Sequence, residues 1–178
     1  DDLDDNIEKW YNIISDSGII SSDSQIISLN EPQNWKTFFD ARHSMPANAL
    51  ERARVNGVLS IITDTIVPPH NFNIFIKDVH AMLKESGIDY LLFGHLGDCH
   101  LHFHLIPDKN NVDLSLDIYN QIIDKSAELD GVYSAEHGTG KRKKMDLLKC
   151  YNQDAVDQIL RCKTGFDPNL ILNQGNVV

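Results

Sequence analysis

Hydrophobic residues recur every three or four positions in several stretches of the chain, which is the pattern of helices with one buried face. Asn30 suits a helix cap and Pro32 a first turn, so a helix begins there. Pro46 disfavours helix in the residue before it, so this helix is expected to end within residues 42–46. The predicted helices are residues 7–14, 30–45, 71–86, 113–130, 141–150 and 154–162.

Alternation with a period of two marks the predicted strands. Residues 100–105 alternate histidine with leucine or phenylalanine, which places three imidazoles on one sheet face and the apolar side chains on the other. Residues 21–29 have the composition of a loop, with a short strand considered for Ile26 and Ile27. The predicted strands are residues 58–62, 90–93, 100–105 and 132–135.

These elements predict an α+β fold. The strands show half-buried alternation and the helices follow them at irregular spacing, which favours an antiparallel, ferredoxin-like sheet with helices packed on one face over a doubly wound parallel sheet. We expect one α+β domain over residues 1–150 and a C-terminal helix and tail over residues 151–178.

The composition is that of a folded protein, with 42% hydrophobic and 24% charged residues among 178. The formal net charge of −10 argues against a nucleic-acid partner, since the only short basic run is Lys141–Lys144. That run fits a solvated helix start or, less well, an anion site. Neither a run of 18 apolar residues nor a signal-peptide pattern is present, so no transmembrane segment is expected.

The three cysteines are odd in number and lack a CxxC spacing, which fits reduced thiols in a cytoplasmic protein. The chain opens on an acidic stretch without an initiator methionine. We therefore expect it to be a fragment or a processed piece.

Histidines are concentrated in one short stretch of the chain. Four of the eight lie within residues 94–104. Neighbouring side chains on one strand face are about 6.6–6.8 Å apart, and two imidazoles at that spacing can converge on one ion at about 2.0–2.1 Å. Adding His95 and a carboxylate, for which Asp98 and Glu136 are candidates, gives a nitrogen and oxygen site suited to zinc, iron or manganese. The alternative is a set of imidazoles that point at water.

A second loop, Ser134–Gly140, carries a glutamate, a histidine and two glycines in the order Glu-His-Gly-Thr-Gly. Glycines allow close backbone approach to a ligand or another loop. A histidine beside a glutamate can act as a general base when a neighbouring ion or carboxylate tunes its pKa. By itself the loop is equally compatible with a plain turn that carries a surface histidine.

Together these loops resemble the C-terminal domain of the FAD-linked 2-hydroxy-acid dehydrogenases, which include the glycolate oxidase flavoprotein subunit, D-lactate dehydrogenases and D-2-hydroxyglutarate dehydrogenase. The family pattern GHxGDGNxH corresponds to residues 94–102, SxEHGxG to residues 134–140 and FDPxxxLNPGK to residues 166–176. Weaker matches are residues 40–43 and 64–68. The resemblance covers most of the chain from about Trp35 onward.

The resemblance implies oxidation of a D-2-hydroxy acid to the 2-oxo acid, with hydride transfer to FAD. It implies that His95, His102 and Glu136 hold a divalent metal in members that have one, and that His137 takes the hydroxyl proton. The resemblance also implies which residues contact the substrate and the flavin. The residues implied to bind substrate are Arg42 against its carboxylate, His104 and His100, and the residue implied to approach the flavin is Asn173.

Departures from the family pattern bear on which substrate we expect. Cys99 and His100 stand where the family has glycine and asparagine, which adds bulk and a further potential ligand. Ile62 and Thr63 stand where some members carry a lysine before the aspartate that matches Asp64. We therefore expect a monocarboxylate such as glycolate or lactate in preference to a dicarboxylate.

The resemblance also implies a partner. The family's FAD-binding domain lies N-terminal to this region, so the expected partner is such a domain in the same polypeptide or in another subunit, against which residues 151–178 would pack. The resemblance also implies a strand before the first helix of the capping domain. We expect this strand to be cut off here, and the sheet edge left without it would favour pairing into a homodimer. The chain alone is expected to be inactive.

Two other classes of function remain open. A stand-alone metal-dependent hydrolase would use His95, His100, His102 and Glu136 without a flavin. A non-catalytic metal-binding module descended from a dehydrogenase would explain the Cys99–His100 departure.

Overall fold

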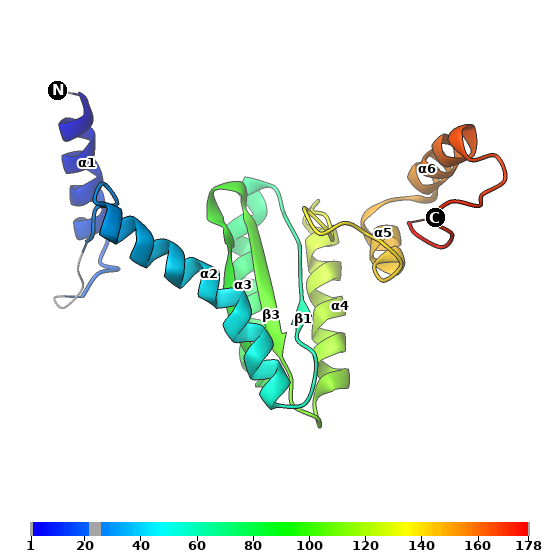
Figure 1. The fold of residues 1–178 in the computed structure, drawn as a ribbon, viewed down its shortest axis with the longest axis horizontal. Coiled ribbons are helices and arrows are strands. Elements are labelled where there is room, and N and C mark those ends of the chain that lie inside the picture. Colours follow the sequence, from blue (N-terminus) through cyan, green and yellow to red (C-terminus); the bar gives the residue numbers. More distant parts are fainter. Residues whose placement is uncertain (1, 22–25, 178) are drawn as a thin grey trace. The chain divides into compact units, whose positions relative to one another are not determined.

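The structure is a computed structural model that describes residues 2–21 and 26–177 (Figure 1). Contacts between residues divide the chain into two compact units, Asp1–Ser44 and Met45–Val178. The expected division at residue 150 stays a prediction. In the part of the chain that the structure describes, no helix combines the length and the apolar composition needed to cross a membrane.

The unit Met45–Val178 is built on a three-stranded antiparallel sheet in the order β1–β3–β2. Its strands are β1 (Ile61–Ile62), β2 (Asp89–His95) and β3 (His100–Ile106). β3 is the central strand, and its register pairs Phe93 with His102 and His95 with His100. The predicted α+β class and the antiparallel pairing are confirmed.

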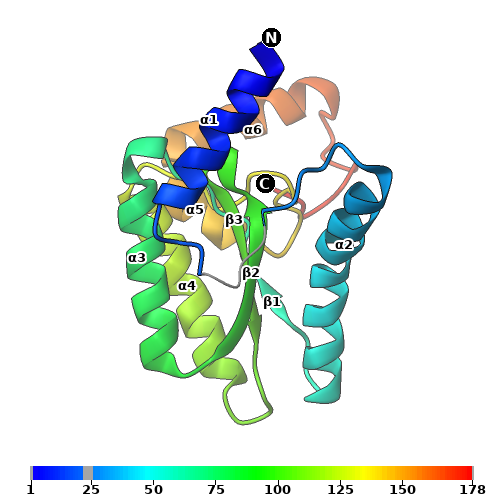
Figure 2. The same cartoon turned by 90° about the vertical axis from the view of Figure 1, so that its left-hand side faces the viewer.

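One face of the sheet is covered by α3 (Pro69–Ser86) and α4 (Val112–Glu128), as Figure 2 shows. Odd-numbered residues of β3 point to this side, so Phe103 and Leu105 are fully buried there. They join a core that the two helices supply from their apolar faces. Its buried helical members are Phe75, Val79, Leu83, Ile118 and Ile122. Helices were predicted to pack on one face of the sheet, and α3 and α4 do so.

The opposite face of β3 carries the histidines, and a helix covers one end of it. There Ala49 and Ala53, from the last turns of α2 (Pro32–Val55), pack on Ile106 at the end of β3. The small alanine side chains let the helix lie close to the strand. Elsewhere on this face the histidine side chains are themselves buried.

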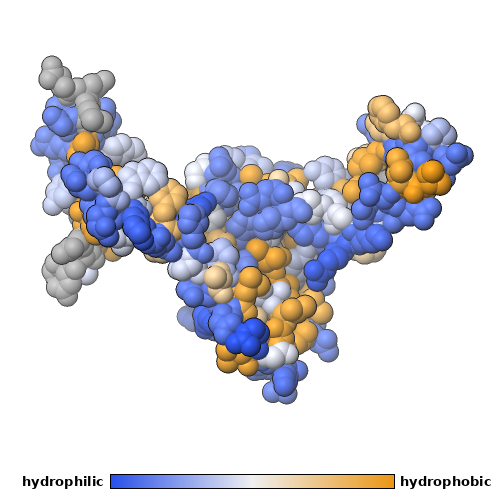
Figure 3. Space-filling model, viewed as in Figure 1, coloured by the Kyte–Doolittle hydropathy of each residue, from blue (hydrophilic) through white to orange (hydrophobic). Residues whose placement is uncertain are grey.

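The C-terminal part of this unit adds α5 (Lys144–Cys150) and α6 (Gln153–Phe166). Tyr133 and Leu147 are buried with Ile123 of α4, and Val177 packs against them. At the end of α6 and in the tail that follows it, several apolar side chains are exposed, with Phe166 at 92% and Ile171 at 67% (Figure 3). The described part of the unit Asp1–Ser44 contains α1 (Asp2–Asp16) and the first turns of α2.

The predicted end of the second helix was wrong. α2 continues through Pro46 to Val55, although proline lacks the N–H that would bond to the carbonyl of Arg42. The seven residues that follow Pro46 include three alanines, a leucine, a glutamate and an arginine, which favour helix strongly. The packing of Ala49 and Ala53 adds to that preference.

Two predicted strands are shorter than expected. Only Ile61 and Ile62 of residues 58–62 form a strand, because the backbone N–H of Val58 bonds to the carbonyl of Ala53 at the end of α2. Residues 132–135 form isolated bridges to Ile66 and Asp64 instead of a full strand. Ile26 and Ile27 are not in a strand. The rest of the loop predicted for residues 21–29 lies partly outside the described residues, which exclude 22–25.

Candidate functional site

Three histidines share the face of β3 that α3 and α4 do not cover. His100, His102 and His104 lie two residues apart, and each is no more than 5% exposed. Their burial is a consequence of strand alternation and of the elements that close over them. The alternative, in which these imidazoles point at water, is therefore wrong.

His95 joins them from the end of β2. A short turn, η1 (Leu96–Asp98), connects the two strands and brings His95 opposite His100 in the register. Their rings stack with centroids 5.6 Å apart. Gly94 makes this approach possible, because a Cβ at this position would lie 2.6 Å from the carbonyl oxygen of His100.

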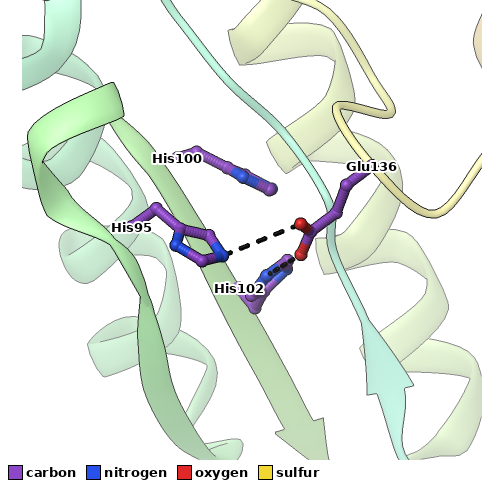
Figure 4. Close-up of side chains that lie close together, drawn as sticks. All are labelled: His95, His100, His102 and Glu136. Atoms are coloured by element: carbon purple, nitrogen blue, oxygen red, sulfur yellow. Dashed lines mark ion pairs between the residues drawn. The ribbon is translucent and has the colours of Figure 1, made fainter.

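Glu136 comes from the loop after the isolated bridges. The backbone N–H of Ala135 donates to the carbonyl of Asp64 at 2.8 Å, which fixes the start of this loop beside β3. Glu136 Oε1 lies 3.0 Å from His102 Nε2, and Oε2 lies 3.7 Å from His95 Nε2. Figure 4 shows the side chains of His95, His100, His102 and Glu136 gathered around one region.

The donor atoms of this group have the spacing of a metal site. Among the described residues, one set of potential ligand atoms within 4.8 Å of one another comes from His95, His100, His102 and Glu136. A second set, from Asp64, His102, Glu136 and His137, shares two members with the first. The structure thus brings together the predicted metal ligands His95, His102 and Glu136, and their role as ligands stays a prediction.

The protonation of His102 fits a cation at this place. Its Nδ1 lies 3.2 Å from the carbonyl oxygen of Thr63, which can only accept a hydrogen bond, so the neutral ring carries its proton on Nδ1. Burial, together with nearby His100 and His137, lowers the pKa of His102 and favours this neutral form. The lone pair on Nε2 then faces a carboxylate oxygen of Glu136, and a cation between the two atoms relieves their repulsion.

Asp64 is a central residue that the sequence reasoning did not assign to the site. It is fully buried and lies two residues after the end of β1. Burial alone would raise its pKa, but hydrogen bonds from the Ser134 hydroxyl and the His137 backbone, with the charge of Lys143, hold the pKa of Asp64 well below its usual range. Asp64 is therefore a buried, charged residue of the site. A signal for it in the sequence is the polar run Thr63-Asp64-Thr65 directly after the apolar Ile61 and Ile62.

His137 lies against the metal-ligand group. Its ring is stacked on that of His102, with centroids 4.9 Å apart and planes 12° from parallel. Nδ1 of His137 lies 3.6 Å from Asp64 Oδ1, and Nε2 lies 3.6 Å from Glu136 Oε1. The side chain is 40% exposed, so a substrate can reach it.

His104 occupies the next position along the strand and differs from its neighbours. Burial, with the nearby His102 and His137, lowers its pKa to about 4, so the ring is neutral at neutral pH. Its Nδ1 is buried without a hydrogen-bond partner, and its ring lies 4.8 Å from that of Phe93. An unpartnered buried nitrogen costs free energy unless a ligand satisfies it, which agrees with the predicted contact to substrate.

Two predicted site residues lie elsewhere in the chain. Arg42 is an exposed residue of α2 in the unit Asp1–Ser44, and its contact with substrate stays a prediction. Asn173 lies in the C-terminal tail with a φ of 45°. It lines a pocket together with Gly140, Lys163 and Phe166. Its predicted approach to a flavin is likewise untested.

A family model and individual relatives both place this chain in the same protein family. The model of the family described as "FAD linked oxidases, C-terminal domain" matches residues 11–177. The chain is 30% identical over 121 residues to glycolate oxidase subunit GlcD of Bacillus subtilis, which covers 66% of this chain and 26% of that protein.

Two further relatives extend this match. D-2-hydroxyglutarate dehydrogenase of Haemophilus influenzae is 30% identical over 122 residues, covering 67% of this chain and 12% of that protein. D-lactate dehydrogenase of Anaerostipes hadrus is 26% identical over 182 residues, covering 98% of this chain and 36% of that protein. The chain therefore spans 36% or less of the length of each of these three relatives.

Proposed function

This chain belongs to the family of C-terminal domains of FAD-linked oxidases, and from that premise we propose that it forms the substrate-facing wall of an FAD-dependent dehydrogenase for a D-2-hydroxy acid of the glycolate or D-lactate type. The product is the corresponding 2-oxo acid. The observation that carries this proposal is the convergence of His95, His102 and Glu136 beside His137. The relatives named for glycolate, D-lactate and D-2-hydroxyglutarate support the substrate class.

The metal would be held by His95, His102 and Glu136. Two neutral imidazoles and one carboxylate form a donor set that suits zinc, iron or manganese. When bound, the cation supplies Lewis-acid polarisation of the substrate hydroxyl, and the flavin supplies a hydride acceptor. The carboxylate of Glu136 lowers the net positive charge of such a centre and holds the two imidazoles in place.

His137 is the proposed base. Asp64 lies 3.6 Å from its Nδ1 and is charged, so it favours the tautomer with the proton on Nδ1. The free lone pair is then on Nε2, which lies on the side of Glu136 and accepts the hydroxyl proton of the substrate. The backbone N–H of His137 donates to Asp64 at 2.8 Å and fixes the residue at its backbone as well.

The remaining contacts place the substrate. Arg42 would bind its carboxylate with two parallel hydrogen bonds, which a planar guanidinium allows. His104 is neutral and offers Nδ1 to a substrate oxygen. Ile62 and Thr63 provide no cation before Asp64, so nothing at this position neutralises a second carboxylate. This favours a short monocarboxylate over 2-hydroxyglutarate.

The flavin would come from a separate FAD-binding domain, in the same polypeptide or in another subunit. The exposed apolar side chains at the end of α6 and in the tail offer a surface for it. Phe166, Ile171 and Leu172 are more than 60% exposed, and Asn173 adjoins them. In this arrangement Asn173 approaches the flavin, as the family resemblance implies.

The test is an activity assay on the complete gene product, with a dye as electron acceptor. We expect D-lactate or glycolate to reduce the dye, L-lactate to be inert, and His137→Gln to lower kcat by about 10²–10⁴-fold. The exposed His70→Gln is the matched control, and its kcat should equal that of the wild type. An FAD-loaded protein that oxidises none of the short D-2-hydroxy acids would contradict the proposal.

A further inference from the structure

We propose that His100 is a fourth protein ligand, so that the metal centre of this chain is a site of three histidines and one glutamate that binds zinc. This inference rests on the proposed metal site at His95, His102 and Glu136 and adds a residue specific to this sequence. The family pattern that the chain resembles has an asparagine at the position of His100.

The geometry includes His100 in the group. Its potential ligand atom lies within 4.8 Å of those of His95, His102 and Glu136. Its ring centroid is 4.5 Å from that of His102, edge to face, and 5.6 Å from that of His95. Figure 4 shows the ring directed toward the carboxylate of Glu136. Because His100 is 5% exposed, its ring is held in this direction by its surroundings.

A hydrogen bond to Asp64 sets the tautomer of His100 that can bind a metal ion. Nε2 of His100 lies 3.0 Å from Asp64 Oδ1, and a charged carboxylate can only accept, so Nε2 carries the proton. The lone pair of the neutral ring is then on Nδ1. A carboxylate that accepts a hydrogen bond from one ring nitrogen fixes the tautomer and makes the other nitrogen a more basic metal ligand.

The same hydrogen bonds decide between the two overlapping sets of donor atoms. The second set would need Asp64 itself as a ligand. However, Asp64 already accepts from His100, from the Ser134 hydroxyl at 2.6 Å and from the backbone N–H of His137 at 2.8 Å. Three of its roughly four acceptor positions are therefore occupied. The set with His100 leaves these hydrogen bonds intact.

The donor set determines the kind of ion. Three imidazoles and one carboxylate provide all four positions of a tetrahedral zinc ion from the protein. A three-donor site leaves one of those positions open, so this chain should hold zinc more tightly than a variant with asparagine at position 100. A substrate oxygen would then bind as a fifth ligand, because zinc sites can expand from four to five coordination.

The experiment is a zinc titration of the metal-free 178-residue chain, followed by nitrogen-15 NMR of the imidazoles. We expect three imidazoles to show zinc-bound nitrogen shifts at one equivalent of zinc, and two in His100→Asn. Competition with a chelator should give an affinity for His100→Asn that is at least about tenfold weaker. The exposed His70→Asn is the matched control and should bind as the wild type does.

The outcomes separate this inference from the proposed function. Two zinc-bound imidazoles in the wild type, or equal affinity in His100→Asn, would overturn the role of His100 and leave the centre at His95, His102 and Glu136. No zinc binding by the wild type would overturn both. The imidazole count is made on the wild type, so it decides the question even if His100→Asn does not fold.

Discussion

The carboxylate of Asp64 accepts the backbone N–H of His137 at 2.8 Å, although 73 residues separate them in the sequence. The same carboxylate accepts from Nε2 of His100 at 3.0 Å. One buried side chain thus joins the strand that carries the histidines to the loop that carries Glu136 and His137. The site depends on this link, because neither element alone places all of its residues.

Replacing Asp64 with asparagine should weaken both the fold and the site. The change removes the charge that Lys143 and Ser134 contact, and we expect a loss of about 3–5 kcal/mol in the free energy of unfolding. Asp146→Asn is a matched control, since Asp146 is also buried and accepts from the Tyr119 hydroxyl at 2.7 Å, but it belongs to neither set of donor atoms.

Urea unfolding and zinc affinity measured on both variants check this prediction. Asp64→Asn should lower the zinc affinity as well as the stability, whereas Asp146→Asn should lower the stability alone. If both variants bound zinc equally well, Asp64 would have only a structural role.

Replacing Gly94 should weaken zinc binding more than replacing the nearby Gly97. A Cβ there would lie 2.6 Å from the His100 carbonyl oxygen and 2.9 Å from the Leu101 Cα, and its φ of 149° disfavours other residues. Gly94→Ala should therefore separate β2 from β3, displace His95 and weaken zinc binding. Gly97→Ala, with no atom within 4 Å of its Cβ, is the control. Calorimetric titration of the two variants would reveal the contrast, and equal affinities would contradict it.

The stability of the metal-free protein should fall in mild acid, in part through His104. Its pKa is about 4 in the folded chain and 6.5 unperturbed, so between these values the unfolded state binds more protons. Stability therefore rises with pH across this window, by up to about 1.4 kcal/mol per pH unit for one group. Urea unfolding at intervals from pH 4 to pH 7 should give a shallower slope for His104→Asn than for the wild type. Parallel slopes would show that His104 titrates normally.

The core under the histidine face should be costly to disturb. Phe103 is fully buried between the sheet and the helices α3 and α4, so Phe103→Ala should cost about 3–5 kcal/mol. Leu59 is 82% exposed, and Leu59→Ala should change the stability by less than about 0.5 kcal/mol. The urea concentrations at the unfolding midpoints of the two variants, each compared with that of the wild type, test this prediction. A midpoint for Phe103→Ala near that of the wild type would contradict the packing described here.

Sequence patterns predicted the elements whose signal is local. The alternation over residues 100–105 located the central strand and its histidine face, and the helical spacing located α3 and α4. The motifs at residues 94–102 and 134–140 also identified the family that the comparison supports. The end of α2 was missed, because the packing of Ala49 and Ala53 against Ile106 outweighs the local effect of Pro46.

Asp64 was missed for a different reason. Its role comes from contacts with His100, Ser134 and His137, which lie 36 to 73 residues further along the chain. A single aspartate next to a short strand has no periodic signal that reveals such partners. Long-range hydrogen bonds of this kind appear only once the chain is folded.

If the cluster around Glu136 is a metal centre, the zinc affinity of Glu136→Gln should show it. Glutamine keeps the shape of the side chain but removes the charge, and Glu136 is 45% exposed, so the fold should survive. Glu85→Gln, also exposed, is the control. We expect one zinc ion per wild-type chain, unchanged binding in Glu85→Gln and an affinity at least about tenfold weaker in Glu136→Gln. Equal affinities in Glu136→Gln and the wild type would contradict it.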